Sequence, residues 1–177
     1  MAESKPPLIK NKTVGGDDWT VLRLQAGDTA NNVKISAGKI IVPLKVWQAQ
    51  QTTLRERADL GVWLACDAAL EELGSDLGYF AVIAVDFPVF NDGRGYSLAY
   101  QLRVRLGFRG ELRAIGDVLR DQLFYLQRVG FDAFTPRPDR DIHDALKGLS
   151  DFSERYQPSW DEPLPLSRRV QRKGVKT

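Results

Sequence analysis

The 177-residue sequence has one cysteine, one histidine and no long apolar run. Its single Cys66 excludes an internal disulfide, and no set of thiols is available for an iron–sulfur cluster or a structural zinc ion. His143 has no second histidine with which to complete a metal site, and we expect it on a helix surface. The sequence therefore predicts no metal site and identifies no cofactor.

Membrane and targeting signals are lacking as well. The N-terminal sequence MAESKPPLIKNK has no apolar core of the kind found in secretory signals. No segment approaches the roughly 18 apolar residues of a membrane span. We expect a cytoplasmic protein with no membrane partner.

The chain has little excess of either charge, because 25 Lys and Arg residues are balanced by 23 Asp and Glu residues, for a net charge of +2. Nucleic-acid binders usually carry a clear basic excess, so no nucleic-acid partner is expected. Residues 158–177 hold five positive and two negative side chains, so the basic excess lies at the C-terminus. Such a tail could dock on an acidic partner protein or simply keep a flexible end solvated.

The length and composition favour one folded domain. Hydrophobic residues make up 43% of the chain and charged residues 27%, as in ordinary soluble proteins. A complete eight-unit β/α barrel needs about 250 residues and is excluded. We expect a flexible N-terminus over residues 1–7, a single domain over residues 8–157 and a flexible basic tail over residues 158–177.

The hydrophobic pattern alternates between short strands and helices. A Gly-Gly-Asp-Asp turn at residues 15–18 separates two β-branched stretches and predicts a β-hairpin over residues 8–24. Apolar runs then predict strands at residues 40–44, 61–65, 80–85, 111–115 and 131–134. Helices are expected at residues 46–57, 67–73, 96–106, 118–129, 139–149 and 152–156, with Asp67 and Asp117 as N-caps.

This alternation predicts an α/β fold. Its centre is a parallel sheet of about five strands with right-handed βαβ crossovers, preceded by the N-terminal hairpin. A three-layer sandwich is the first expectation for such a sheet, and a half-barrel is the alternative.

Ligands of open parallel sheets bind beyond the carboxyl ends of the strands, where helix N-termini present free N–H groups. The loop after the strand at residues 80–85 is the richest there. It offers an oxyanion site built from Arg94 and Ser97, from two glycines that allow close backbone approach, and from Asp92. We include Arg113 as a further anion-binding candidate, so the predicted set is Asp92, Gly93, Arg94, Gly95, Ser97 and Arg113. Alternatively, the loop is a tight turn in which Arg94 pairs with a neighbouring carboxylate.

Two carboxylates follow neighbouring strands, Asp86 and Asp117. They are candidate catalytic residues, because a facing pair could perform acid–base chemistry or hold a divalent ion. Structural roles compete for both, since Asp117 precedes a predicted helix and Asp86 could accept backbone N–H groups. Cys66 also follows a strand, and a buried, inert thiol competes there with a reactive one.

The segment from residue 80 to residue 134 resembles a bacterial family known as domain of unknown function 934. The similarity lies in AVDFP at residues 84–88, DGRGYS at 92–97, GELRAIGDVLRDQ at 110–122 and GFD at 130–132. Weaker similarity covers residues 17–19 and 42–44. The resemblance implies an association with sulfite reduction, because members are commonly labelled probable oxidoreductases of that pathway and their genes lie beside sulfite reductase and the sulfonucleotide reductase.

Three hypotheses follow. The first is an accessory protein of assimilatory sulfate or sulfite reduction that binds an oxyanion or a sulfonucleotide and works with sulfite reductase or the sulfonucleotide reductase. The second is an oxidoreductase that uses a bound nucleotide or electrons from a partner, because the chain has no redox centre of its own. The third is a metal-assisted hydrolase or lyase that uses Asp86, Asp92 and Asp117.

Overall fold

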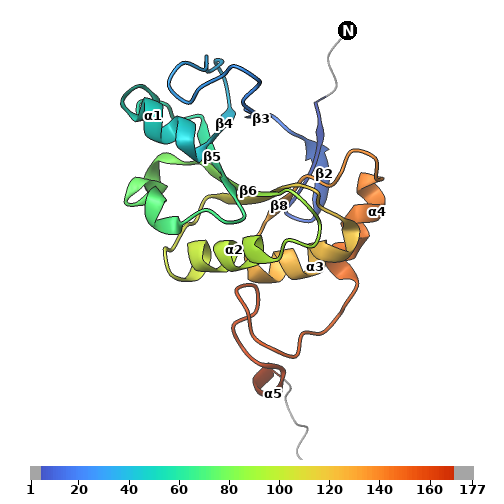
Figure 1. Cartoon of the computed structure of the whole chain (residues 1–177). Coiled ribbons are helices and arrows are strands. Elements are labelled where there is room, and N and C mark those ends of the chain that lie inside the picture. The colour runs from blue at the N-terminus through green and yellow to red at the C-terminus, as the bar shows by residue number, and fades with distance from the viewer. Residues whose placement is uncertain (1–4, 170–177) are drawn as a thin grey trace, which may run out of the picture.

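The computed structural model describes residues 5–169, and within them eight strands form one sheet (Figure 1). The strand order across the sheet is β2-β1-β8-β7-β6-β5-β4-β3. The strands are β1 (Pro7–Lys10), β2 (Thr13–Gly16), β3 (Thr20–Val21), β4 (Ile40–Pro43), β5 (Leu60–Ala65), β6 (Val82–Phe87), β7 (Glu111–Gly116) and β8 (Ala133–Phe134). The pairs from β3 to β8 are parallel, whereas β1 pairs antiparallel with both β2 and β8.

The helices lie on one face of the sheet. From β4 to β8 each new strand is added on the same side of the previous one, so every right-handed crossover places its connection on the same face. The sheet consequently curls into a half-barrel with helices outside, and the expected three-layer sandwich is wrong. The helices are α1 (Leu44–Leu54), α2 (Arg94–Val104), α3 (Arg120–Val129), α4 (Ile142–Lys147) and α5 (Leu166–Arg169), with 3₁₀ turns η1 (Leu70–Leu73), η2 (Asp76–Tyr79) and η3 (Gly148–Ser150).

The short connection between the two edge strands shows that the sheet is strongly curled. β2 and β3 are opposite edges of the sheet, yet only residues 17–19 join them. Four Cα–Cα steps reach at most about 15 Å. A flat eight-stranded sheet is about 34 Å wide, because neighbouring strands lie about 4.8 Å apart. Residues 17–19, which we call the strap, therefore cross the open side of the half-barrel (Figure 1).

The N-terminal hairpin forms, but its turn is not where the sequence suggested. The turn lies at Asn11 and Lys12, whose φ angles of 51° and 62° are those of the primed turns that favour hairpins. Gly15 and Gly16 belong to β2 instead. The β-branched stretch after the glycines supplies β3 at the far edge of the sheet, so it is not the second strand of the hairpin.

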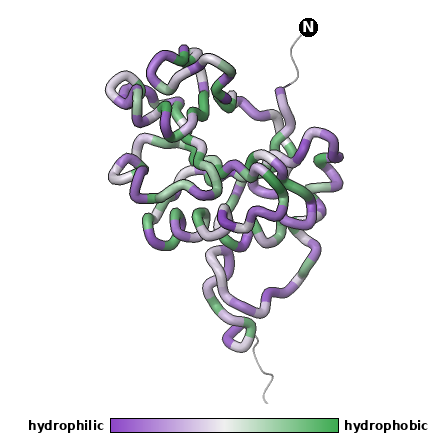
Figure 2. Tube along the Cα trace, viewed as in Figure 1, coloured by the Kyte–Doolittle hydropathy of each residue, from purple (hydrophilic) through white to green (hydrophobic). Residues whose placement is uncertain are grey.

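The two faces of the sheet bury different amounts of apolar surface. The main core lies between the outer face and α1 to α4, and it includes Trp47, Leu64, Ile83, Val85, Leu102, Leu123 and Phe134. The inner face, which carries no helix, has a small cluster of Ile41, Val82, Ala84 and Ile115, against which Trp19, Val21 and Trp63 pack. In Figure 2, hydrophobic colour runs along much of the central strands, and hydrophilic colour is more frequent in the peripheral loops.

A buried ionic network occupies the rest of the inner face. Arg113 of β7 is completely buried and contacts Glu111 at 2.6 Å and Asp17 of the strap at 2.6 Å. Lys10 of β1 binds the other oxygen of Glu111 at 2.7 Å. Asp17 also accepts the backbone N–H of Trp19 at 3.0 Å. The network joins β1, β7 and the strap, so it fixes the strap on the inner face.

Several predicted helices differ in the structure. The helix expected at residues 67–73 is only the 3₁₀ turn η1, and residues 152–156 form no helix. Asp117 is not the cap of α3, because that helix begins three residues later and Gln122 accepts the backbone N–H of Leu119 at 2.9 Å. At its other end, Gly130 terminates α3 with a φ of 119°, as the sequence predicted.

The predicted tail begins with a segment that contacts the domain. Ser159 donates to the backbone oxygen of Arg128 at 2.7 Å, and the guanidinium of Arg109 lies 5.1 Å from the Trp160 ring centre. At the other terminus, Pro7 is already part of β1. The remainder of both predicted flexible ends, residues 1–4 and 170–177, lies outside the described residues.

Removing the central guanidinium should destabilise the fold strongly. Arg113→Ala leaves Glu111 and Asp17 buried without their cation, so we expect the free energy of unfolding to fall by about 3–5 kcal/mol. Urea unfolding followed by tryptophan fluorescence measures this. Arg105→Ala, at an exposed position of the same residue type, is the control and should change stability by less than about 0.5 kcal/mol. A loss below about 1 kcal/mol for Arg113→Ala would contradict the assigned role of the network.

Candidate functional site

A pocket of about 440 Å³ lies on the inner face, at the carboxyl ends of β7 and β8. Its walls come from four parts of the chain: Pro6 ahead of β1, the strap with β3 and Arg23, the end of β7, and the loop after β8. The lining residues include Trp19, Val21, Arg23, Ile115, Gly116, Thr135, Pro136 and Pro138. This is the sheet edge where ligands of α/β proteins bind, and the volume is within the usual range for small-molecule sites.

Arg23 is the cationic side chain of this pocket. Its two terminal nitrogens donate to the two oxygens of Asp86 at 2.5 and 2.7 Å. The guanidinium also lies 4.7 Å from the ring centre of Trp63, whose indole N–H donates to the backbone oxygen of Leu22 at 2.9 Å. Arg23 is therefore held by an ion pair and by an aromatic face.

Asp86 is the penultimate residue of β6, Asp117 directly follows the neighbouring strand β7, and each already has partners. Both oxygens of Asp86 accept from Arg23. One oxygen of Asp117 accepts the backbone N–H of Phe90 at 3.0 Å, and the other accepts from Arg137 at 3.2 Å. Both carboxylates thus connect segments of the chain at this edge.

In the loop at residues 92–97, Arg94 pairs with neighbouring carboxylates, which the sequence analysis gave as the alternative to an oxyanion site. Arg94 donates to Asp92 at 2.8 and 3.0 Å and lies 3.4 Å from Asp67. The Arg94 guanidinium in turn lowers the pKa of the Asp92 carboxyl. Arg94 thus pairs with neighbouring carboxylates, as in a structural turn, and its side chain is 59% exposed outside the inner-face pocket.

The other residues of the predicted anion site lie apart from a common cavity. A Cβ on Gly95 would lie 2.7 Å from the Phe87 ring and 3.0 Å from the Cys66 sulfur, so this glycine serves packing. Gly93 precedes the first residue of α2 and Ser97 is an exposed residue of that helix. Arg113 belongs to the buried network of the inner face.

Cys66 is buried, and its sulfur donates to the backbone oxygen of Asp86 at 3.1 Å. Burial raises the pKa of the thiol to about 11. The thiolate form is therefore scarce near neutral pH. His143 is exposed on α4, where the sequence placed it.

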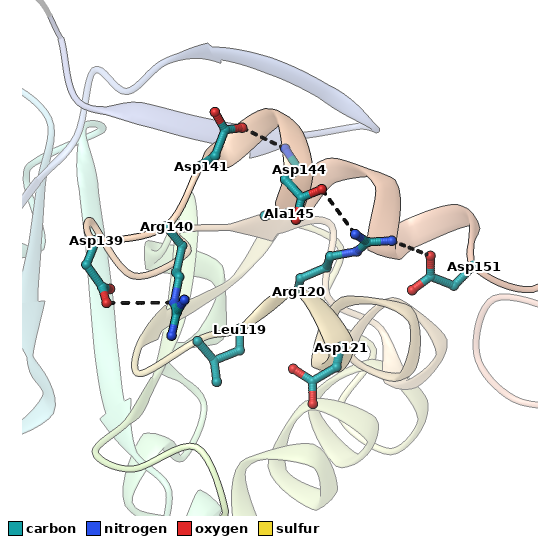
Figure 3. A pocket seen from close by; sticks show the side chains of 9 residues that line it. All are labelled: Leu119, Arg120, Asp121, Asp139, Arg140, Asp141, Asp144, Ala145 and Asp151. Atoms are coloured by element: carbon teal, nitrogen blue, oxygen red, sulfur yellow. Dashed lines mark hydrogen bonds and ion pairs between the residues drawn. The ribbon is translucent and has the colours of Figure 1, made fainter.

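A larger hollow of about 590 Å³ lies outside the sheet, between the first turns of α3 and α4 (Figure 3). Arg120 bridges Asp144 and Asp151 at 3.1 Å each, and Arg140 lies 3.7 Å from Asp139. Asp141 accepts the backbone N–H of Asp144 at 2.7 Å as the N-cap of α4. The two bonds of Arg120 join α3 to α4 and to Asp151. The lining holds five aspartates and two arginines, so the hollow is net negative.

Neither a metal centre nor a membrane helix is found in the described part of the chain. Among residues 5–169 no three His, Cys, Asp or Glu side chains are grouped so that they could hold a metal ion. No helix there has the length and hydrophobicity needed to cross a membrane.

Sequence reasoning missed Trp19 and Arg23, which line the pocket. Trp19 directly precedes β3 and Arg23 follows it, whereas the sequence predicted both within the N-terminal hairpin, away from the carboxyl ends of the parallel strands. Their position depends on β3 pairing with β4 instead of β2. The Trp-x-x-x-Arg spacing, which places both side chains on one face of a strand, was the available signal.

The buried thiol should be almost unreactive. With a pKa of about 11, about 0.1% of Cys66 is thiolate at pH 8, whereas a free cysteine with a pKa near 8.5 is about one quarter ionised. We expect iodoacetamide to alkylate the native protein at least about 100-fold more slowly than free cysteine. Because Cys66 is the only cysteine, mass spectrometry reports the rate directly. The same reaction in urea is the control, and equal rates in both states would show that the thiol is accessible in the fold.

The comparisons with known proteins agree with the resemblance seen in the sequence. A family model described as a bacterial protein of unknown function, DUF934, matches residues 61–167, from within β5 to α5. No curated protein and no solved structure matches the sequence. The match covers more than half of the chain, and the chain belongs to the DUF934 family.

Proposed function

We propose that the protein binds a small, oxyanion-bearing molecule in the inner-face pocket and serves assimilatory sulfate or sulfite reduction as an accessory protein that works with sulfite reductase. The observation that carries the binding function is the pocket itself, with Arg23 at its wall. The pathway is proposed from the family resemblance in residues 80–134. Sulfite and sulfonucleotides both carry oxyanions of the kind that a guanidinium recognises.

Charge around the pocket favours an anion. Asp17 and Asp18 line the pocket, but Arg113 contacts the first, and Lys5 and Lys39 contact the second. The lining itself holds one cation, Arg23, and these two carboxylates. When the partners that neutralise them are included, the linked ion pairs hold five cations and four carboxylates, a net charge of +1; they are Lys5, Lys10, Arg23, Lys39, Arg113, Asp17, Asp18, Asp86 and Glu111.

The two enzymatic hypotheses receive less support. An oxidoreductase would depend on a bound nucleotide or on electrons from a partner, because the only thiol is buried and largely protonated. A metal-assisted hydrolase needs Asp86, Asp92 and Asp117 to converge. Within residues 5–169 they form no such group, and each carboxylate is bonded to an arginine.

A growth experiment tests the proposed pathway. In the organism that encodes this chain, deletion of the gene should slow growth on sulfate and on sulfite but not on cysteine, because the defect precedes cysteine formation. The wild-type gene and Arg105→Gln should restore growth, whereas Arg23→Gln should not, since it removes the cation of the pocket. Growth of the deletion strain at the wild-type rate on sulfate would refute the pathway assignment.

A further inference from the structure

The lining of the inner-face pocket indicates a ligand that has an apolar part as well as an oxyanion. The pocket wall is apolar at Trp19, Pro136 and Pro138, and the side chains of Val21 and Ile115 add to this apolar lining. Proline has no N–H group, so this wall offers flat apolar surface with few hydrogen-bond donors. Indole faces stack readily on planar rings. A bare oxyanion such as sulfite would leave this surface without a partner.

Arg23 has donors to spare. A guanidinium carries five N–H groups, and within residues 5–169 the bonds that Arg23 donates go only to Asp86, which takes two of them. The Arg23 side chain is 44% exposed, whereas Asp86 is 16% exposed, so the guanidinium is the accessible member of the pair. Its position on Trp63 orders the side chain before any ligand arrives, which lowers the entropy lost on binding.

The neighbouring polar groups fit the same arrangement. Thr135 lies at the end of β8 and lines the pocket, half-buried. Gly116, at the end of β7, has a φ of 93°, and a Cβ there would lie 2.8 Å from an oxygen of Asp86. The glycine thus leaves the Arg23–Asp86 pair room at the pocket wall.

We propose that this pocket binds a planar aromatic heterocycle joined to an oxyanion, the chemistry of a nucleoside monophosphate. The ring lies against Trp19 and the prolines, and the oxyanion takes the unused N–H groups of Arg23. Asp86 holds Arg23 in place but competes with the anion for its charge. The inference deepens the proposed binding function and rests on the same pocket, but it does not depend on the pathway.

Isothermal titration calorimetry of the full chain tests the proposal with three probes: 5′-AMP, adenosine and inorganic phosphate. AMP should bind more tightly than either adenosine or phosphate, because only AMP occupies both parts of the pocket. No AMP binding at millimolar concentration, or equal affinities for AMP and phosphate, would overturn the proposal.

Variants of the ion pair should act in opposite directions. Arg23→Gln should weaken AMP binding at least about tenfold and leave adenosine binding unchanged, since hydrogen bonds to a charged group are lost. Asp86→Asn keeps the shape of the carboxylate but removes its charge, so it should strengthen AMP binding severalfold. Misfolding would lower the AMP affinity, so a gain in affinity for Asp86→Asn could not result from a variant that fails to fold. Arg105→Gln is the matched control and should leave AMP affinity unchanged.

Variants of Trp19 test the proposed contact with the heterocyclic ring. Trp19→Ala should weaken AMP and adenosine binding and spare phosphate binding, and Trp19→Phe should restore most of the AMP affinity.

If Arg94→Gln abolished AMP binding while Arg23→Gln did not, the loop at residues 92–97 would be the anion site and the proposal would fall. Normal growth of the deletion strain together with Arg23-dependent AMP binding would refute the pathway and leave the present inference standing.

Discussion

The contact between Asp17 and Arg113 is the interaction on which the shape of the inner face depends. The strap must pass from one edge of an eight-stranded sheet to the other within three residues, and its first side chain binds a guanidinium that is buried in the middle of the sheet. Burying these charges is costly unless they are paired. The strap therefore supplies the partner that Arg113 requires, and Arg113 keeps the strap on the inner face. Trp19 and Arg23 are placed at the pocket as a consequence.

A second regularity is the pairing of arginine with aspartate at the carboxyl ends of the parallel strands. Arg94 pairs with Asp92, Arg137 pairs with Asp117 and Asp139, and Arg23 pairs with Asp86. Arg94 and Asp92 lie in one loop, whereas Arg137 joins the loop after β8 to Asp117 in the loop after β7. Both pairings neutralise charge that sequence motifs alone would assign to a site. The third joins β3 to β6 across the inner face and adjoins the pocket. The Arg23–Asp86 pair consists of the same residue types as the other pairs and differs from them in its position beside the pocket.

Most strands and the main helices were predictable because their signals are local. Continuous apolar runs gave β4 to β8 within about two residues, and spaced leucines with a terminal glycine gave α3. The turn of the hairpin was misplaced because Gly15 and Gly16 resemble a turn, whereas Asn11 and Lys12 adopt it. The helix expected after Asp67 became a 3₁₀ turn, because seven residues are too few to offset the cost of helix nucleation even though Ala, Leu and Glu favour helices.

The sequence by itself determined the α/β class, the succession of strands along the chain and the isolation of Cys66, because periodicity, turn residues and counting need no knowledge of distant neighbours. Only the tertiary structure decided between sandwich and half-barrel, and only it brought Trp19 and Arg23 beside the ends of β7 and β8. It also showed that Arg94 and Arg113 already have partners. These outcomes depend on contacts such as that of Asp17 with Arg113, between residues far apart along the chain, which no local pattern records.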